Sequence, residues 1–111
     1  MSVFLTGSES FIGRVVVQRC QELAIDVSGI DSHAPDNEIS KRADIRDPEI
    51  ADLIPEGATV VHLAAISRDP DCVSDPKGAF DINVTGTLNV ALAAQQRHAS
   101  QLIFASSEWV Y

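Results

Sequence analysis

The chain opens with Ser2-Val3-Phe4-Leu5-Thr6-Gly7-Ser8-Glu9-Ser10-Phe11-Ile12-Gly13-Arg14, the stretch that decides its fold. An apolar, β-prone run over residues 3–5 breaks into a small polar turn at Gly7, and an apolar helical pattern follows from Phe11. A strand, a glycine turn and a helix in this order make a helix N-terminus into an anion site. The stretch therefore predicts the phosphate-binding turn of a dinucleotide-binding βαβ unit.

Three positions specify this turn and its ligand. Gly7 permits the tight turn, and Gly13 lets the helix pack closely on the sheet. Ser10 stands where a third glycine is usual, and either its Cβ holds the phosphate further out or its hydroxyl donates a hydrogen bond to the phosphate. Ser8 and Ser10 are both candidate caps of the helix.

An acid follows the second predicted strand. Asp31 lies 18 residues after Gly13, where a carboxylate accepts hydrogen bonds from both ribose hydroxyls of a dinucleotide and repels a 2′-phosphate. No arginine adjoins Asp31 in the sequence. The predicted cofactor is therefore NAD rather than NADP.

The hydrophobic pattern alternates between strands and helices along the whole chain. We therefore predict one α/β domain over residues 1–111, a Rossmann-type doubly wound parallel sheet with strand order 3-2-1-4-5. The predicted strands are 1–6, 26–30, 41–45, 59–65 and 102–106, and the predicted helices are 11–24, 48–54 and 77–99, with loops at 32–40 and 67–76.

Each of the two longer helices carries an apolar stripe, which we expect to face the sheet. The first stripe and its margin comprise Phe11, Ile12, Val15, Val16, Arg19, Cys20 and Leu23, and the second stripe comprises Phe80, Val84, Leu88, Ala91 and Leu92.

Composition limits the classes of function. The chain has 8 Lys and Arg against 16 Asp and Glu, a net charge of −8, which argues against nucleic acid or an anionic membrane as partner. Cys20 and Cys72 lie outside any metal-binding spacing and are expected to be free thiols, and we predict no metal site. No basic leader region precedes the first strand, and no apolar run approaches the roughly 20 residues of a membrane span. We therefore expect a cytoplasmic protein.

The candidate site residues fall at the carboxyl ends of the predicted strands, where an open α/β sheet binds its ligands. They are Thr6, Gly7, Asp31, Asp44, Ala65, Ser106 and Ser107. Five blocks of the chain, in order, resemble the extended short-chain dehydrogenase/reductases, the NAD-dependent epimerase/dehydratase family. These blocks are Thr6-Gly7-x-x-Ser10-Phe11-Ile12-Gly13, Asp44-Ile45-Arg46-Asp47, His62-Leu63-Ala64-Ala65, Asn83-Val84-Thr85-Gly86-Thr87 and Phe104-Ala105-Ser106-Ser107-x-x-Val110-Tyr111.

The resemblance implies roles for particular residues. Asp44 and Ile45 would flank the adenine, and Asn83 would steady the site from the long helix. Ser107 would be the catalytic Ser/Thr, which hydrogen-bonds the reacting sugar hydroxyl or carbonyl. The cofactor-binding set is Gly7, Ser10, Phe11, Ile12, Gly13, Asp31, Asp44, Ile45, Leu63, Ala64, Ala65, Asn83 and Ser106. His62, central to a predicted buried strand, is interpreted as a core histidine rather than a base.

By the same resemblance, the function is that of a nucleotide-sugar epimerase or dehydratase, in which hydride moves transiently from a sugar carbon to NAD. Glu108-Trp109 stands where dehydratases have an Asp-Glu pair, which favours an epimerase. The family's proton-transfer Tyr-x-x-x-Lys is absent from these 111 residues, and Tyr111 belongs to the preceding block. We therefore expect an NAD-binding N-terminal portion that is inactive alone.

Two alternatives remain: a non-catalytic NAD-binding or interaction module, and a disrupted fragment that binds nothing. A Tyr-x-x-x-Lys motif encoded beyond residue 111 would favour the N-terminal portion of an enzyme, and a stop codon would favour the module. We also predict a homo-oligomer, formed through the long helix or through an exposed edge at residues 102–106.

Overall fold

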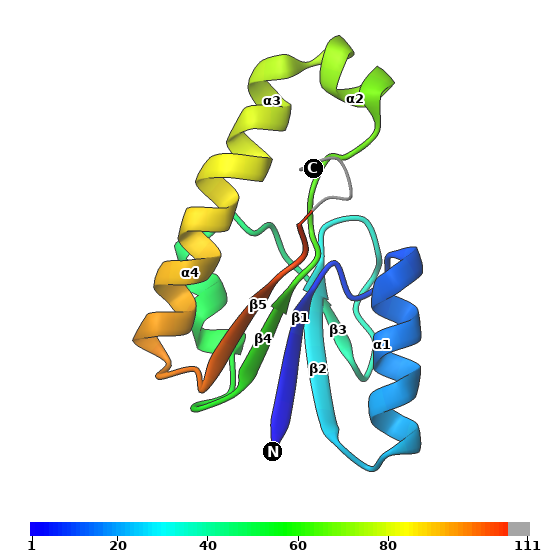
Figure 1. The fold of residues 1–111 in the computed structure, drawn as a ribbon, viewed down its shortest axis with the longest axis vertical. Helices are drawn as coiled ribbons and strands as arrows, with labels where there is room; N and C mark the ends of the chain where they lie inside the picture. Colours follow the sequence, from blue (N-terminus) through cyan, green and yellow to red (C-terminus); the bar gives the residue numbers. More distant parts are fainter. Residues whose placement is uncertain (107–111) are drawn as a thin grey trace.

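Five parallel strands form the sheet of the computed structural model, which describes residues 1–106. Their order, β3-β2-β1-β4-β5, confirms the prediction. The order reverses between β1 and β4, whose carboxyl ends lie side by side at the upper edge of the sheet in Figure 1. The strands are β1 (Ser2–Thr6), β2 (Asp26–Asp31), β3 (Ser40–Arg42), β4 (Thr59–His62) and β5 (Gln101–Phe104).

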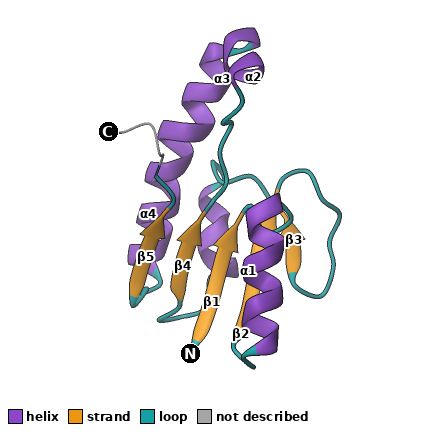
Figure 2. Ribbon diagram, turned by 45° about the vertical axis from the view of Figure 1, so that its right-hand side comes forward, coloured by secondary structure: helices purple, strands orange, loops and turns teal. Residues whose placement is uncertain are grey.

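Helices cover both faces of the sheet, as Figure 2 shows. On one face, α1 (Phe11–Glu22) buries Cys20 against Val3 and Leu5 of β1. On the other face, α4 (Thr87–Gln96) and the 3₁₀ helix η1 (Pro48–Leu53) enclose a larger core around Phe4 and Val60. The alternation of side chains along β1 and β4 therefore sends odd and even positions into two separate cores.

The predicted long helix is present, but its middle turn is wider than an α-helix. It runs through α3 (Pro76–Phe80), a π-helical turn η2 (Asp81–Gly86) and α4. The backbone is right-handed helical at both joints, so the helix is continuous. The predicted loop at 67–76 is partly wrong, because α2 (Asp69–Ser74) forms a short helix there with a proline in its first turn.

The predicted inward stripe of α1 is wrong in most of its members. Phe11 is 88% exposed, and Ile12, Val15 and Leu23 are also exposed. The face towards the sheet instead carries Gly13, Val16, Val17 and Cys20. Close contact at Gly13 sets the rotation of the helix, because a side chain at this position would collide with the turn before it.

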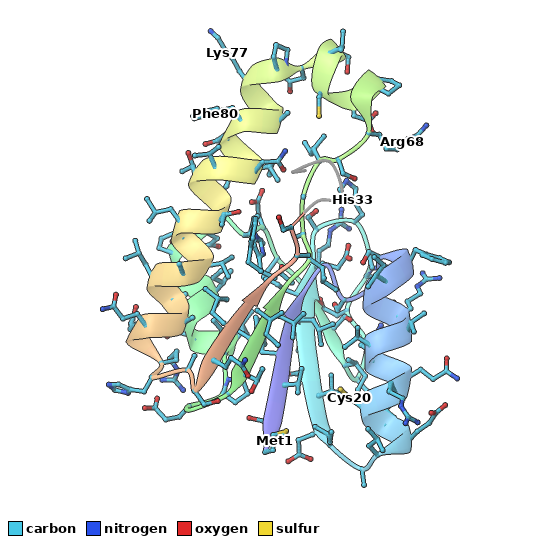
Figure 3. All side chains as sticks on the ribbon, in the orientation of Figure 1. Met1, Cys20, His33, Arg68, Lys77 and Phe80 are labelled. Atoms are coloured by element: carbon cyan, nitrogen blue, oxygen red, sulfur yellow. The ribbon has the colours of Figure 1, made fainter. Side chains whose placement is uncertain are left out.

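The predicted stripe of the long helix is likewise turned outward. Phe80, Val84, Leu88 and Leu92 are all at least half exposed, and Phe80 projects away from the sheet in Figure 3. Small residues let the helix lie close to its neighbours, and a Cβ on Gly86 would lie 2.5 Å from Cδ1 of Ile45. The buried face of α3, η2 and α4 consists of Ala79, Gly86, Val90, Ala93 and Ala94.

Two smaller differences matter for the site. β4 ends at His62, so residues 63–66 leave the sheet three positions earlier than predicted. The 48–54 segment is a 3₁₀ helix capped by Asp47, whose carboxylate accepts a hydrogen bond from the Glu49 N–H. In the part of the chain that the structure describes, no helix is both long and apolar enough to cross a bilayer.

Candidate nucleotide-binding site

The glycine turn between β1 and α1 lies against backbone on two sides. Gly7 has φ +69°, and a Cβ there would lie 3.1 Å from the Ala64 nitrogen. The N–H groups of Gly7 and Ser8 both donate to the Ile30 carbonyl of β2, at 2.9 and 3.2 Å. The turn is therefore fixed between the ends of β2 and β4, and a side chain at Gly7 would be strained both by the positive φ and by these close backbone atoms.

The first turn of α1 presents unused donors. Among residues 1–106, no acceptor is placed against the backbone N–H of Phe11 or Ile12, the first two residues of the helix. These donors lie at the positive end of the helix dipole, where an anion is stabilised. Phe11 and Ile12 thus offer backbone N–H groups, which explains how residues with exposed side chains can belong to a cofactor site.

Ser10 is the cap of α1. Its hydroxyl donates to the Gly7 carbonyl at 2.6 Å and accepts the Gly13 N–H at 3.1 Å. The hydroxyl proton is therefore used inside the turn, which argues against the alternative in which Ser10 donates to a phosphate. A Cβ on Gly13 would lie 2.1 Å from the Gly7 oxygen, so Gly13 is required for this arrangement.

Asp31 faces the turn from the end of β2. Its Oδ2 accepts the Glu9 N–H at 3.0 Å, and its Oδ1 accepts the His33 N–H at 2.9 Å. A carboxylate has about four lone-pair positions, so each oxygen keeps acceptor capacity for a ligand. No arginine or lysine among the described residues forms a salt bridge with this carboxylate, although Arg42 of β3 stands opposite Asp31 in the register of the sheet.

A salt bridge fixes the wall formed by Asp44 and Ile45. Arg46 donates to the Asp44 carboxylate through Nη2 at 2.6 Å and Nε at 3.0 Å, and its Nη1 reaches Asp81 of η2 at 2.8 Å. These hydrogen bonds hold the pKa of Asp44 below its ordinary value. All three side chains are substantially exposed, so the bridge contributes little stability but ties this loop to the long helix.

Residues 63–66, after the end of β4, form another wall of the site, beside the glycine turn and the Asp44–Ile45 segment. The Asn83 side chain accepts the Ile66 N–H and donates to the Ile66 carbonyl, both at 2.8 Å. Asn83 therefore holds the 63–66 segment through its backbone rather than lining the cavity. Leu63 and Ala64 donate their backbone N–H groups to the Thr6 hydroxyl, each at 3.0 Å.

These walls enclose a cavity of about 190 Å³ at the carboxyl edge of the sheet. Pockets for drug-sized ligands are larger, about 300–1,000 Å³, so the cavity encloses only part of a dinucleotide. His33, labelled in Figure 3, lies above the strand ends at its rim. The lining comprises eight residues predicted from the sequence, Gly7, Ser10, Asp31, Asp44, Ile45, Leu63, Ala64 and Ala65, and six that were missed, Ile30, Ser32, His33, Ala43, Ile66 and Ile82.

Five predicted cofactor residues do not line the cavity. Phe11, Ile12, Gly13 and Asn83 lie in the helices beside it, and Ser106 is an exposed residue beyond the end of β5. The predicted catalytic Ser107 lies outside the described residues. His62 is buried and hydrogen-bonded through both ring nitrogens, as expected of a core histidine.

A parallel sheet with a glycine turn, a helix N-terminus and a strand-end acid at its switch point defines a Rossmann-type nucleotide-binding protein. The model of the NAD dependent epimerase/dehydratase family matches residues 3–111. The chain belongs to this family.

Three relatives show the extent of the match. An N-acetyl-alpha-D-glucosaminyl-diphospho-ditrans,octacis-undecaprenol 4-epimerase of Escherichia coli O157:H7 is 35% identical over 99% of this chain and 33% of its own length. The crystal structure of a Stenotrophomonas maltophila UDP-glucose-4-epimerase with bound NAD and formylated UDP-arabinopyranose has a TM-score of 0.88 and 29% identity, over the whole of this chain and 38% of that one.

The third is the UDP-glucose 4-epimerase of Thermus thermophilus in complex with NAD. It has a TM-score of 0.83 and 29% identity, and the match covers 96% of this chain and 38% of that one. The chain thus spans between about one third and two fifths of the length of these relatives.

Proposed function

We propose that residues 1–111 are the NAD-binding portion of a nucleotide-sugar epimerase. The observation that carries the proposal is the position of two unlike groups beside one glycine turn, at the carboxyl edge of the sheet. Unused N–H donors of Phe11 and Ile12 suit the pyrophosphate, and the Asp31 carboxylate, which forms no salt bridge among the described residues, suits two ribose hydroxyls. The relatives with bound NAD support the choice of cofactor.

The residues of this chain would bind and orient the cofactor. The glycine turn and the first turn of α1 would hold the pyrophosphate, Asp31 the adenosine ribose, and Asp44 and Ile45 the adenine. Leu63, Ala64 and Ala65 would continue along the dinucleotide towards the nicotinamide. When bound, NAD supplies a hydride acceptor for a sugar carbon, and we propose Ser107 as the group that hydrogen-bonds the reacting sugar oxygen.

The same proposal makes the isolated chain catalytically silent. The only tyrosine is Tyr111, so these 111 residues contain no Tyr-x-x-x-Lys. A lysine that lowers the pKa of a tyrosine is what allows a phenol to act as a general base near neutral pH. Nucleotide-sugar turnover by the 111-residue chain alone would overturn this part of the proposal.

Calorimetric titration with NAD and with NADP tests the cofactor site directly. We expect NAD to bind more tightly than NADP, because Asp31 repels a 2′-phosphate. Asp31→Asn should weaken NAD binding about tenfold or more, since a charged acceptor contributes roughly 1.5–3 kcal/mol per hydrogen bond. Asp52→Asn, which removes an exposed acid of η1, is the matched control. Equal loss in both variants, or no binding of NAD by the wild type, would contradict the assignment.

We also propose self-association through the long helix. Phe80, Val84, Leu88 and Leu92 recur every four residues and form an exposed apolar strip along one side of it. A second copy of the same helix would bury this strip. The strand β5 is a second candidate surface, because all four of its residues are exposed.

A cytoplasmic location is part of the proposal. The two cysteines, Cys20 and Cys72, are unpaired thiols, as expected of a reducing compartment.

A further inference from the structure

His62 sits at the centre of a chain of hydrogen bonds that the proposed function does not use. It is the last residue of β4 and is 3% exposed. Its Nδ1 lies 2.6 Å from Oγ1 of Thr6 at the end of β1, and its Nε2 lies 2.9 Å from Oγ1 of Thr87 at the start of α4. The imidazole thus links the two central strands to the long helix.

The neighbours of the ring determine which nitrogen carries the proton. The Thr6 hydroxyl already accepts two N–H groups, from Leu63 and Ala64. A hydroxyl has two acceptor positions and one proton, so the Thr6 proton must go to Nδ1. On the other side, the Thr87 hydroxyl donates to the Asn83 carbonyl at 2.6 Å, so it accepts from Nε2. The ring is therefore neutral and carries its proton on Nε2.

The two ends of this series of hydrogen bonds both lead to the same segment, residues 63–66. At one end, Thr6 holds Leu63 and Ala64. At the other end, Asn83 holds both backbone groups of Ile66 through its side chain, within the π-helical turn η2. Single π-helical turns inside α-helices are frequent at functional sites. The hydrogen bonds of His62 therefore form a relay that reaches both ends of the 63–66 wall: directly to Thr6 at one end, and at the other through Thr87 to the backbone carbonyl of Asn83, whose side chain holds Ile66.

We propose that His62 is a positioning residue of the cofactor site, holding the 63–66 wall in place through Thr6 on one side and through Thr87 and Asn83 on the other. The proposal rests on the proposed NAD site. His62 is too buried to touch the ligand, so it acts through the backbone groups at Leu63, Ala64 and Ile66. Uncharged groups face the ring from every element packed on it: Thr6 of β1, Phe104 of β5, whose ring centroid is 5.9 Å away, and Thr87 of α4.

Protonation breaks the relay for a geometric reason. An imidazolium donates from both nitrogens, so Nδ1–H would point at a Thr6 oxygen whose acceptor positions are occupied by Leu63 and Ala64. One of these two hydrogen bonds must then break; the Leu63 N–H also lies 3.3 Å from the Thr6 carbonyl, whereas the Thr6 hydroxyl is the one acceptor that the described residues place against the Ala64 N–H. The hydrogen bonds that hold residues 63–66 in place should therefore weaken as His62 becomes protonated with falling pH, although the ring never contacts the ligand.

The tautomer can be measured directly on the ¹⁵N-labelled chain. Two-bond ¹⁵N–¹H correlation spectra at pH 7.5 should show a protonated Nε2 and an unprotonated Nδ1 for His62. A protonated Nδ1 at this pH would overturn the relay. This measurement needs no substitution and no ligand, so it is independent of the proposed function.

Thr87→Val and Thr87→Ser provide the matched pair of variants. Valine keeps the volume of the side chain and removes the hydroxyl, whereas serine keeps the hydroxyl. We expect Thr87→Val to speed hydrogen exchange of the Ile66 amide and to raise the Kd for NAD, each by about five- to tenfold, the effect of one net hydrogen bond. Thr87→Ser should restore both values to within about twofold of the wild type.

The outcomes separate the two proposals. If the wild type binds NAD and Thr87→Val binds it equally well, the positioning role of His62 is wrong. If the wild type binds no NAD, the proposed cofactor site falls and the positioning role falls with it. If Thr87→Val does not fold, the comparison of wild type with Thr87→Ser decides: a Kd for NAD that rises as the ¹⁵N shifts of His62 report its protonation, in both proteins, supports the relay, and a Kd that stays constant through that titration contradicts it.

Discussion

Gly13→Ala is the substitution that should damage the nucleotide-binding turn most directly. The added Cβ would lie 2.1 Å from the Gly7 carbonyl oxygen and 2.9 Å from the Ser10 hydroxyl oxygen. The first contact is nearly 1 Å shorter than the 3.0 Å below which real Cβ contacts essentially do not occur, and its partner is backbone. Either α1 must move away from the sheet or the turn must deform.

Two opposing effects set the size of the change in stability. Alanine is favoured over glycine in a helix by about 1 kcal/mol. Against this, overpacking in a closely packed site costs about 1–3 kcal/mol, and displacing the Ser10 cap costs about 1 kcal/mol more. Because the steric cost exceeds the gain in helix propensity, we expect the free energy of unfolding to fall by about 1–3 kcal/mol. NAD affinity should fall at least about tenfold, because the deformed turn carries the Phe11 and Ile12 donors.

Urea unfolding followed by circular dichroism measures the stability, and calorimetric titration measures the NAD affinity. Gln18→Ala is the control, because Gln18 is exposed on the same helix and alanine there adds no contact. The control should stay within about 0.5 kcal/mol of the wild type. If Gly13→Ala is as stable as Gln18→Ala and binds NAD as the wild type does, the close contact between α1 and the turn has no consequence, and the reasoning is refuted.

Three further predictions concern other parts of the chain. Ser10→Gly should bind NAD more tightly while losing only a few tenths of a kcal/mol of stability, because it removes the Cβ from the pyrophosphate site; an unchanged Kd would show that the Cβ does not obstruct binding. Burial holds the pKa of His62 in the folded protein below its ordinary value. At a pH between the folded and the unfolded pKa, the unfolded state therefore binds a proton that the native state does not. The urea midpoint should accordingly fall as the pH drops below about 6.5. His62→Gln should flatten that dependence, and an equally steep profile in the variant would assign it to another group. Leu88→Glu should shift sedimentation from dimer to monomer, whereas Gln95→Glu, an exposed control on α4, should leave the dimer intact; a monomeric wild type at high concentration would contradict association through this helix.

Strand order and the position of the site were predictable because they follow from local signals. Alternating strand and helix patterns give a parallel sheet, and right-handed crossovers restrict its order. The polar residues at strand ends then converge wherever the sheet places those ends. Gly7, Asp31 and Ala64, which are far apart in sequence, line one cavity for this reason.

Helix orientation was not predictable from hydrophobicity alone. In α1, contact at Gly13 decides which face packs on the sheet, and in the long helix Gly86 and small residues do so. A hydrophobic pattern weights large side chains, whereas close packing here selects small ones. The close contacts of Gly13 with the glycine turn and of Gly86 with Ile45 depend on the three-dimensional arrangement, so the sequence alone does not show them.

The hydrogen-bonded parts of the site were also beyond sequence reasoning. Asn83 was expected to steady the site, but its grip on both backbone groups of Ile66 depends on the early end of β4. The bridge from Arg46 to Asp81 joins residues 35 positions apart. Such pairs carry no local signal in a single sequence, because neither residue type is unusual where it stands.

The small-residue face of the long helix has a consequence for how the chain can vary. Substitutions on the outer side, at Leu88 or Leu92, meet solvent or a neighbouring molecule, so side chains of many sizes fit there. On the inner side, a single methyl group added at Gly86 would press on Ile45, which lines the cavity. Random mutagenesis should therefore recover more replacements on the outer side of this helix than on the inner side, and the less tolerant side would mark the wall of the cavity.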